Sequence, residues 1–378
     1  MDTWRSLLAR ALVWNSTKTL SRNIRFDRTM AKRTHKGAVT IKDIVAKTGY
    51  SLGTVSRALN GIEGVRPNVR KSVVDAAREL GYRPNLGAKS MRSKKFGNVA
   101  FLADMSNIAF TRIALGAQSY LKEHNYSMSL CHIDDEDTVS QIDHYMGKQQ
   151  FDGVLLSPNC EPSEALSDVI HSAGLPYVLI NRELPGLSGG VIIDYYNSVA
   201  EAMDYLIDLG HVGILIVGGS ANILPTMRSI QAYRDIRRKR GLHDTREYIA
   251  CGRIDERWGT EAVLSQIEEI RDGRITAILS LNNTIFIGVL KELRRSDVTC
   301  PADVSLISFE DGHLLSLLEP PITAIVRPLL EVGVRAAERL IWLMGENGND
   351  VGPADSASLD VRTQLVKRES CGPVRRPD

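Results

Sequence analysis

Residues 39–61 carry the side-chain types with which a short helix can bind DNA. The segment reads Val-Thr-Ile-Lys-Asp-Ile-Val-Ala-Lys-Thr-Gly-Tyr-Ser-Leu-Gly-Thr-Val-Ser-Arg-Ala-Leu-Asn-Gly. Its hydroxyl side chains suit phosphate oxygens, and its arginine can donate two hydrogen bonds to the edge of a guanine. The spacing of its apolar residues predicts two short helices joined by a tight turn, a form that can enter the major groove of DNA.

The two helices are also predicted from their capping residues. Thr40 with Asp43 three residues later is a variant of the capping box, and Ser51 can cap the second helix. Gly49 stands where the chain must turn sharply, a position that favours positive φ, and Asn60-Gly61 can stop the second helix. The residues expected to face the core are Ile41, Ile44, Val45, Val55 and Leu59. An ordinary helical hairpin is the alternative interpretation.

Charge is divided between two parts of the chain. Residues 1–95 carry 21 Lys and Arg against 6 Asp and Glu, a net charge of +15, whereas the remainder carries 26 against 39, a net charge of −13. This division indicates a nucleic-acid-binding end joined to an acidic body, because an ordinary solvated surface would not sort the two signs by domain. We expect the basic end to bind phosphates with a steep salt dependence.

Length and composition set the broad class of protein. With 378 residues, 43% of them hydrophobic and 24% charged, the chain can form two or three domains with full cores. Its five cysteines are scattered without the paired spacing of a metal site, which predicts reduced thiols in a cytoplasmic protein with neither metal nor cofactor. No apolar run approaches the roughly 20 residues of a membrane span, so we expect no membrane partner.

The basic end is predicted to contain three segments. Residues 1–38 are expected to be a disordered basic arm, or an upstream extension with Met30 as the working start. Residues 39–84 form the DNA-binding headpiece, which includes a third, amphipathic helix whose apolar stripe is Val69, Val73, Ala76, Ala77 and Leu80. Residues 85–95 form a hinge helix that is too short and weak to be stable alone and should order on a partner.

Apolar strands alternate with helices from residue 96 to residue 370. Strands are expected at 98–103, 127–131, 153–157, 176–181, 191–193, 212–217, 248–251, 277–281, 305–309 and 363–366, and helices at 110–124, 140–149, 196–209, 258–270 and 284–295. This pattern predicts an α/β fold of doubly wound parallel sheets covered on both faces. Two such series predict two lobes with a ligand cleft at the carboxyl ends of the strands. Residues 371–378 are expected to be a disordered tail.

These features together resemble the lactose/galactose-repressor (LacI/GalR) family of bacterial transcriptional regulators. The matching motifs are Thr40-x-x-Asp43 and Thr54-Val55-Ser56-Arg57 in the headpiece, Tyr82-x-Pro84-Asn85 before the hinge, and Pro176–Arg182, Leu209–His211, Pro301–Ser305 and Pro320–Thr323 in the body. The resemblance covers residues 39–370. It implies a helix-turn-helix headpiece, a two-lobed body like that of periplasmic sugar-binding proteins, a homodimer, and control by a small-molecule effector.

The resemblance also implies which residues contact DNA. Leu52, Gly53 and Arg57 match base-reading positions, where Gly53 offers no side chain and should make readout loose. In the hinge, Asn85, Ala88 and Met91 match positions that contact the minor groove, with Met91 as an apolar wedge between base pairs. The other residues assigned to DNA contact are Thr40, Ser51, Thr54, Ser56 and Asn60, with added affinity from Lys42, Lys47, Arg66 and Arg70.

The effector cleft implied by the resemblance draws on both lobes. Its predicted residues are Asp104, Phe110, Asn181, Arg182, Arg228, Ile254, Asn282, Asn283 and Glu310. Short polar side chains and an arginine can bond adjacent hydroxyls of a sugar, while an apolar surface packs against its ring. Polar residues that bond loop backbone at strand ends are the alternative for each position.

Three positions depart from the family's pattern in the cleft. Asn282-Asn283 stands where Asn-Asp is usual, and Phe309-Glu310-Asp311 where an aromatic and two Asp are usual. Ser229 stands where an arginine is usual, and the neighbouring Arg228 is expected to substitute for it. These changes remove acidic charge. They predict a sugar acid or sugar phosphate rather than a plain neutral sugar, or a pocket that binds no ligand.

The sequence therefore predicts a sequence-specific transcriptional regulator, a repressor of carbohydrate or related metabolism that binds a pseudo-palindromic operator as a dimer. An enzyme is disfavoured because the chain has no Gly-rich phosphate loop, metal cluster or Gly-x-Ser-x-Gly elbow, and Gly218-Gly219-Ser220 lacks the rest of a phosphate-loop motif. A transport-type sugar-binding protein would explain the body but not the headpiece. A DNA-binding regulator whose pocket has lost its ligand remains the alternative.

Overall fold

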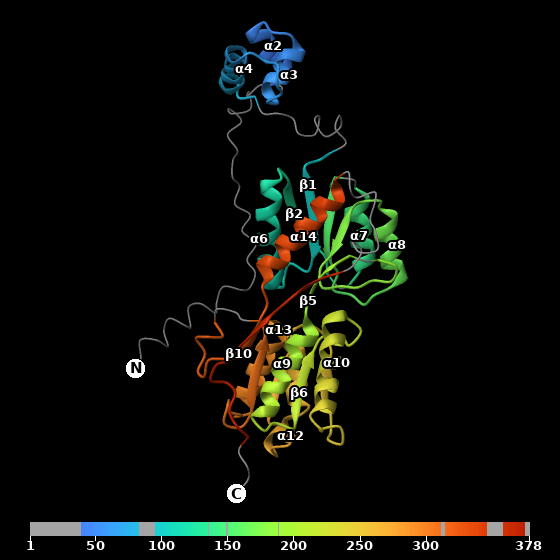
Figure 1. Cartoon of the computed structure of the whole chain (residues 1–378), viewed down its shortest axis with the longest axis vertical. Coiled ribbons are helices and arrows are strands. Elements are labelled where there is room, and N and C mark those ends of the chain that lie inside the picture. The colour runs from blue at the N-terminus through green and yellow to red at the C-terminus, as the bar shows by residue number, and fades with distance from the viewer. Residues whose placement is uncertain are drawn as a thin grey trace, which may run out of the picture. The chain divides into compact units, whose positions relative to one another are not determined.

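The computed structural model describes residues 39–82 and 95–374, apart from residues 135, 149, 188, 311–313 and 346–357. The chain divides into two compact units, with the boundary after Asn85 (Figure 1). We call the described part of the first unit the headpiece and the described part of the second unit the body. The predicted N-terminal arm, the hinge residues Asn85, Ala88 and Met91, and the final residues 375–378 lie outside the described residues.

The headpiece consists of three helices, α2 (Ile41–Thr48), α3 (Leu52–Leu59) and α4 (Pro67–Leu80). The predicted caps are present: the backbone N–H of Thr40 donates to Asp43 Oδ2 at 2.7 Å, and Ser51 Oγ accepts the N–H of Thr54 at 3.3 Å. Gly49 ends α2 with a φ of +72°, which confirms the predicted left-handed turn. The core of the headpiece consists of Ile44, Val55, Ala58, Val73, Ala76 and Ala77.

The first lobe of the body is a four-stranded parallel sheet in the order β2-β1-β3-β4. Its strands are β1 (Asn98–Ala103), β2 (Ser127–His132), β3 (Gly153–Ser157) and β4 (Tyr177–Leu179). One face packs against α6 (Ile108–Glu123) and α14 (Leu329–Met344), and the other packs against α7 (Thr138–Gly147) and α8 (Glu164–Ser172). Helices α6 and α14 cross closely because each has a glycine at the contact: a Cβ on Gly116 would lie 2.0 Å from the carbonyl oxygen of Leu330.

The second lobe is a six-stranded sheet in the order β12-β10-β9-β8-β6-β7. Its strands are β6 (Ile214–Gly218), β7 (Tyr248–Cys251), β8 (Ala277–Ser280), β9 (Ser305–Phe309), β10 (Thr323–Val326) and the antiparallel edge strand β12 (Gln364–Val366). Helices α9 (Tyr195–Asp208) and α10 (Leu224–Lys239) pack on one face, and α11 (Glu256–Leu264) and α13 (Asn283–Arg295) on the other. The predicted pair of parallel, doubly wound sheets is therefore confirmed.

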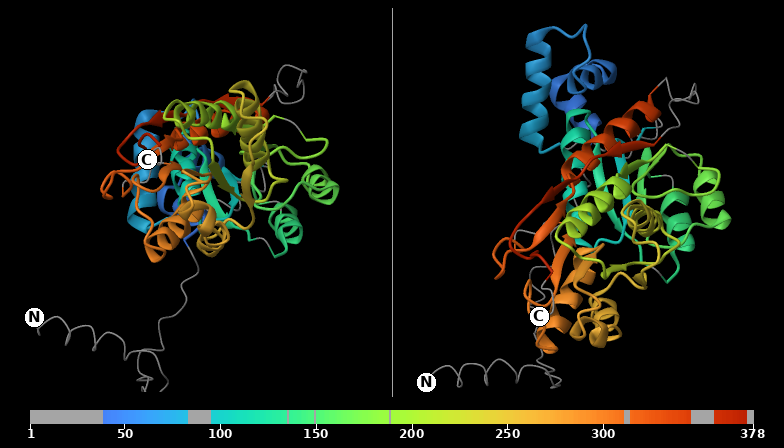
Figure 2. Two further views of the ribbon diagram at one scale, coloured as in Figure 1. Left: turned by 90° about the horizontal axis from the view of Figure 1, so that it is seen from below. Right: turned by 60° about the horizontal axis from the view of Figure 1, so that its bottom comes forward.

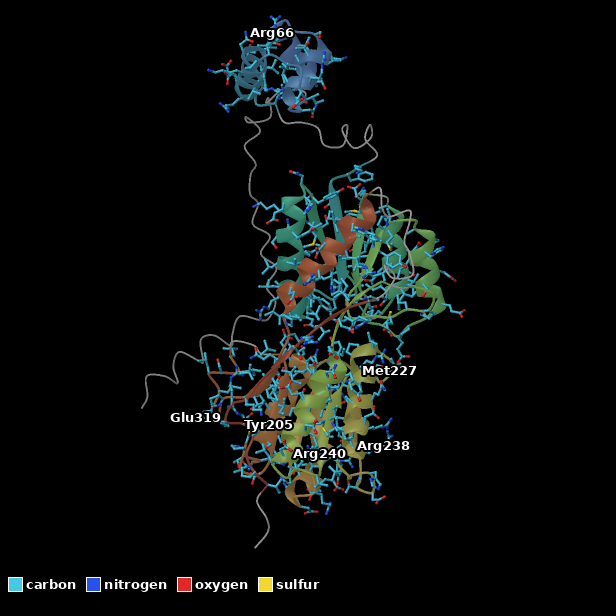
Figure 3. The ribbon with its side chains drawn as sticks, in the orientation of Figure 1. Arg66, Tyr205, Met227, Arg238, Arg240 and Glu319 are labelled. Atoms are coloured by element: carbon cyan, nitrogen blue, oxygen red, sulfur yellow. The ribbon has the colours of Figure 1, made fainter. Side chains whose placement is uncertain are left out.

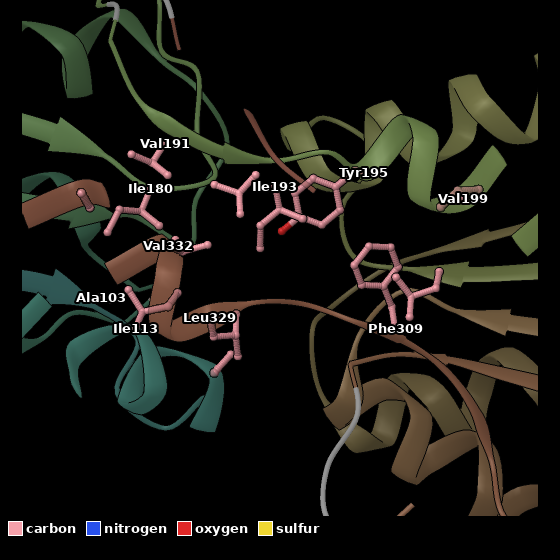
Figure 4. Close-up of a cluster of buried hydrophobic side chains, with 14 of the residues drawn as sticks. Ala103, Ile113, Ile180, Val191, Ile193, Tyr195, Val199, Phe309, Leu329 and Val332 are labelled. Carbon is pink, nitrogen blue, oxygen red and sulfur yellow. The ribbon is translucent and has the colours of Figure 1, made fainter. Parts of the chain in front are cut away.

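The chain crosses between the two lobes three times, as two views of the body show (Figures 1 and 2). The crossings follow β5 (Val191–Ile193), β10 and β11 (Leu359–Val361), and β5 and β11 pair in parallel beside the first lobe. Buried apolar side chains continue across this region, where Tyr195 and Phe309 stack with ring centroids 5.3 Å apart (Figure 4). The lobes thus share one apolar core at the crossovers.

Some elements differ from their predicted form. The helix expected at 258–270 is two helices, α11 and α12 (Ile267–Arg271), because the chain tightens at Gln266, whose N–H bonds to the carbonyl oxygen of Val263. Helices α8, α10 and α14 and strands β10 and β11 were not identified from the sequence. Strands β3, β5, β7 and β9 have the predicted bounds.

Residues 371–374 were predicted to belong to a disordered tail, and the structure shows that this is wrong. The N–H of Val374 donates to the carbonyl oxygen of Leu209 at 3.1 Å, and the N–H of Gly372 donates to Ser305 Oγ at 3.1 Å. His211 Nε2 donates to the carbonyl oxygen of Gly372 at 3.0 Å, while Nδ1 lies 2.9 Å from Thr276 Oγ1. The second lobe therefore satisfies the backbone of this segment, which we call the C-terminal strap.

His211 should make the stability of the body depend on pH. Burial lowers the pKa of this imidazole below its ordinary value, so between that lowered pKa and about 6.5 the unfolded chain binds a proton that the folded chain does not. The free energy of unfolding should fall as the pH drops below about 6.5, by up to about 1.4 kcal/mol per pH unit from this group. Urea unfolding at a series of pH values should show this contribution disappear in His211→Gln and persist in the control His243→Gln, whose imidazole is exposed. An equal slope in both variants would rule out His211 as its source.

Candidate functional site

The residues predicted to read bases come together on one face of α3. Val55 and Ala58 point into the core, whereas Leu52 is 50% exposed. Residues four apart lie along the same side of a helix, so Leu52, Ser56 and Asn60 form one row and Gly53 and Arg57 a neighbouring row. We call these five residues the α3 face.

Arg57 is held along the α3 face by its own helix. Its Nε donates to the carbonyl oxygen of Gly53 at 3.3 Å, and the Arg57 side chain that carries the two terminal nitrogens is exposed. Apart from the adjoining residues and the backbone of α3, no atom of the described residues lies within 4 Å of the position that a Cβ on Gly53 would occupy, so the space beside Arg57 is open. Asn60 Nδ2 donates to the carbonyl oxygen of Ser56 at 2.8 Å. The face therefore exposes one guanidinium and one large apolar side chain.

Phosphate contacts have a second set of candidates at the helix starts. Thr40 and Ser51 cap α2 and α3, and Ser51 Oγ lies 3.0 Å from Thr54 Oγ1. Free N–H groups and the helix dipole favour phosphate at such ends. Two of the predicted cations have partners inside the headpiece: Lys47 bonds Glu79, and Arg70 donates to the carbonyl oxygen of Ile62 at 2.6 Å. Lys42 and Arg66 are exposed, and Arg66 is labelled in Figure 3.

A cavity lies between the two lobes of the body, at the carboxyl ends of their strands. The predicted effector residues that line it are Asp104, Phe110, Asn181, Arg182, Ile254 and Asn282. Phe110 and Ile254 provide apolar surface, and Thr226 and Ser229 add hydroxyl groups from α10. This is the combination of apolar surface and a few placed polar groups that binds small polar molecules.

Three predicted effector residues do not line this cavity. Arg228 is exposed on α10, where its guanidinium lies 3.8 Å from Glu183, so it does not replace the arginine expected at position 229. Asn283 begins α13, and its Oδ1 is buried with no hydrogen-bond partner in the part of the chain that the structure describes. Glu310 is buried behind the cavity because its carboxylate pairs with Arg327.

Asn181 and Arg182 line the cavity and also hold its backbone. Asn181 has a φ of +54°, and its Oδ1 accepts the N–H of Ile193 at 2.9 Å. Arg182 donates from Nε to the carbonyl oxygen of Pro158 at 2.5 Å and from a terminal nitrogen to the carbonyl oxygen of Asn181 at 2.8 Å. These two side chains therefore fix the shape of the cavity floor at the first crossover.

The sequence interpretation missed most of the residues that line the cavity, among them Tyr195 and Arg327. Arg327 follows β10 at the second crossover, and it forms a buried ion pair with Glu310, which follows β9. Burial alone would lower the pKa of Arg327, but the charge of Glu310 and the hydroxyl of Tyr195 raise it. Burial raises the pKa of the Tyr195 hydroxyl, against the opposing charges of Arg327 and Arg182. A charged residue directly after the apolar segment 323–326 was the available sequence signal.

Side chains from the two lobes also meet at the edge of the cavity. Glu161, which follows β3 in the first lobe, accepts hydrogen bonds from Ser220 Oγ at 2.7 Å and Asn222 Nδ2 at 3.0 Å in the second lobe. These bonds lower the pKa of the Glu161 carboxyl. We call this set of three residues the Glu161 latch, because it joins the lobes away from their covalent crossovers.

Within the described ranges, no three His, Cys, Asp or Glu side chains are grouped so that they could hold a metal ion. In that same part of the chain, no helix has both the length and the apolar character needed to cross a bilayer.

Two family models match the chain. The model for bacterial regulatory proteins of the lacI family matches residues 40–85, which include all three headpiece helices. The model for the periplasmic binding protein-like domain matches residues 203–371. The two matches correspond to the headpiece and to much of the body.

Known proteins resemble the chain over most of its length. Catabolite control protein A of Priestia megaterium is 29% identical over 337 residues, covering 88% of this chain and 99% of that protein. The structure of the transcriptional regulator CelR with cellobiose is 26% identical, with a TM-score of 0.66 and coverage of 88% and 99%. The lac repressor dimer bound to operator and the anti-inducer ONPF shares the fold at 20% identity, with a TM-score of 0.76 and coverage of 88% and 99%.

These matches support the arrangement that the sequence predicted, in which a DNA-binding headpiece is followed by a two-lobed body. The relatives are transcriptional regulators and not enzymes. The headpiece belongs to the lacI family of bacterial regulatory proteins, and the chain is a DNA-binding transcriptional regulator.

Proposed function

We propose that this chain represses genes of carbohydrate or related metabolism, and that it does so as a homodimer on a pseudo-palindromic operator in the bacterial cytoplasm, associated with the nucleoid. The observation that carries the DNA-binding part is the α3 face, where Leu52 and Arg57 are exposed on a helix whose opposite side is buried in the headpiece. Such a helix can enter the major groove while the other two helices hold it.

Repression and dimerisation are supported by similar proteins. The lac repressor, which shares the fold, was solved as a dimer bound to operator. Two headpieces related by a two-fold axis would read two half-sites one helical turn apart. In this proposal the hinge residues Asn85, Ala88 and Met91 contact the minor groove between the half-sites.

The cleft between the lobes is proposed as the effector site. It combines the apolar side chains Phe110 and Ile254 with the polar side chains Asp104, Asn181 and Asn282, which suits a small molecule with several hydroxyl groups. CelR, at 26% identity, was solved with cellobiose. An effector that binds the two lobes better at one interlobe angle than at another would shift the spacing of the headpieces and hence the affinity for DNA.

Arg57→Ala should weaken DNA binding and relax its specificity at one base position of each half-site. Loss of a bidentate arginine–guanine contact costs about 1–3 kcal/mol. The measurement is selection of bound duplexes from a random pool at near-physiological salt, followed by affinity measurement on the selected site. Arg78→Ala is the control, since Arg78 is exposed in the last turn of α4, away from the α3 face.

The wild-type chain should enrich a pseudo-palindrome, and Arg78→Ala should enrich the same sequence. Unchanged affinity and base preference in Arg57→Ala would show that α3 is not the recognition helix. A wild-type chain that binds all duplexes alike, with only a steep salt dependence, would refute sequence-specific repression.

Glu161→Ala should shift the body toward an open cleft. The variant loses both hydrogen bonds that Glu161 accepts from the second lobe, so the ratio of closed to open states should fall, by a small factor because the carboxylate is at the surface. Hydrogen exchange should be faster in the segment 219–223, which holds Ser220 and Asn222. Glu164→Ala, in the first turn of α8, is the matched control. Equal exchange rates in the two variants would mean that the Glu161 latch does not hold the lobes together.

A further inference from the structure

We propose that Arg327 selects the charge of the effector, and that the effector is a polyhydroxylated molecule with a single carboxylate group, a sugar acid. This inference rests on the proposed role of the cleft as the effector site and names the class of molecule that the site takes.

The first observation is an unsatisfied donor on Arg327. This side chain is 9% exposed and lines the cavity. Its terminal nitrogen donates to Glu310, yet its Nε is buried without a hydrogen-bond partner among the described residues. A buried N–H without an acceptor is unfavourable, and native structures avoid it. Arg327 must turn its Nε, which has almost no exposed surface, toward the cavity before an acceptor atom on a bound molecule can remove this penalty.

The second observation is the arrangement of charge around Tyr195. Arg182, Arg327 and Glu310 all lie close enough to Tyr195 to act on its hydroxyl electrostatically. The two guanidinium groups and one carboxylate that act on this hydroxyl sum to a net charge of +1, and Asp104 is the other charged side chain that lines the cavity. A monoanionic carboxylate matches that charge, whereas a phosphate ester carries about −1.5 to −2 at pH 7. Guanidinium groups also match carboxylates in shape, through paired N–H donors.

Other residues that line the cavity suit hydroxyl groups. Asp104 Oδ1 accepts hydrogen bonds from the backbone and side chain of Ser106, which leaves its other carboxylate oxygen for a ligand donor. From α10, Thr226 and Ser229 are neutral, and Arg228 is directed to Glu183 instead of the cavity. The two arginines that line the cavity therefore follow β4 and β10, and neither stands at the second-lobe position where the family usually has one.

The test is calorimetry with the full-length chain and a fixed panel of compounds. The panel consists of D-glucuronate, D-galacturonate and D-gluconate, the neutral sugars D-glucose and D-galactose, and D-glucose 6-phosphate. We expect at least one sugar acid to bind tenfold or more tightly than its neutral parent. Arg327→Gln should reduce this preference at least tenfold, and the control Arg335→Gln, exposed on α14, should keep it.

A second variant separates a loss of ligand preference from a loss of the folded state. Arg327→Gln leaves Glu310 buried without its partner, so the double variant Arg327→Gln with Glu310→Gln removes both charges together. Thermal unfolding establishes that each variant is folded. The double variant should also show no preference for sugar acids.

Several results would overturn the inference. They are a neutral sugar or the phosphate ester binding at least as tightly as every sugar acid, no compound of the panel binding, or a full preference for sugar acids in a folded Arg327 variant. Selection of DNA by the same preparations separates the two proposals. Operator enrichment without sugar-acid preference would refute only the inference about Arg327, and sugar-acid binding without operator enrichment would refute only the proposed repression.

Discussion

The buried ion pair between Glu310 and Arg327 is the interaction on which the arrangement of the body depends. Each partner stands at the end of a strand in the second lobe, and Arg327 begins the second crossover to the first lobe. Removing one partner of such a pair costs about 3–5 kcal/mol, because the other charge is left buried. Glu310 also has a φ of +109°, a conformation that non-glycine residues adopt only where their surroundings enforce it. The pair, its backbone and the stacked rings of Tyr195 and Phe309 therefore form one rigid unit at the junction of the lobes.

This junction lies directly beside the cavity, so a molecule bound in the cleft can act on the junction. Arg327 and Tyr195 belong both to the cavity wall and to the crossovers, so a ligand that contacts them acts on the segments about which the lobes turn. At the far edge, the Glu161 latch joins the lobes through exposed and individually weak hydrogen bonds. The ion pair is a strong constraint at the crossovers, and the Glu161 latch is a weak one at the edge. We therefore expect the lobes to rotate about the crossovers without sliding past each other. Ligands change such an equilibrium only through a difference in affinity between its states.

Much of the fold could be predicted because local patterns decide it. The caps at Thr40 and Ser51, the turn at Gly49 and the buried strands β3 and β9 depend on neighbouring residues, and the structure has them as predicted. The cavity was less predictable, because the direction of a side chain depends on partners far along the chain. Arg228 turns to Glu183, and Arg327 turns inward to Glu310. The C-terminal strap is ordered by His211 and Ser305, which lie more than sixty residues away from it.

The affinity of the headpiece for DNA determines how strong its coupling to the cleft must be. Gly53 leaves open space on the α3 face, so in the proposed mode of DNA binding we expect base readout to depend mainly on Arg57 and Leu52, with few specific contacts in each half-site. A protein that binds its operator with modest affinity is released by a small coupling free energy between the effector site and the DNA-binding site. A coupling of about 1.4 kcal/mol changes the affinity for DNA tenfold, and this lies within the usual range for linked sites. A recognition helix that makes few specific base contacts therefore suits a body whose lobes are joined at the edge only by the weak hydrogen bonds of the Glu161 latch. Filling the space at Gly53 with a base-reading side chain would tighten DNA binding, and the same interlobe coupling would then release a smaller fraction of the bound protein.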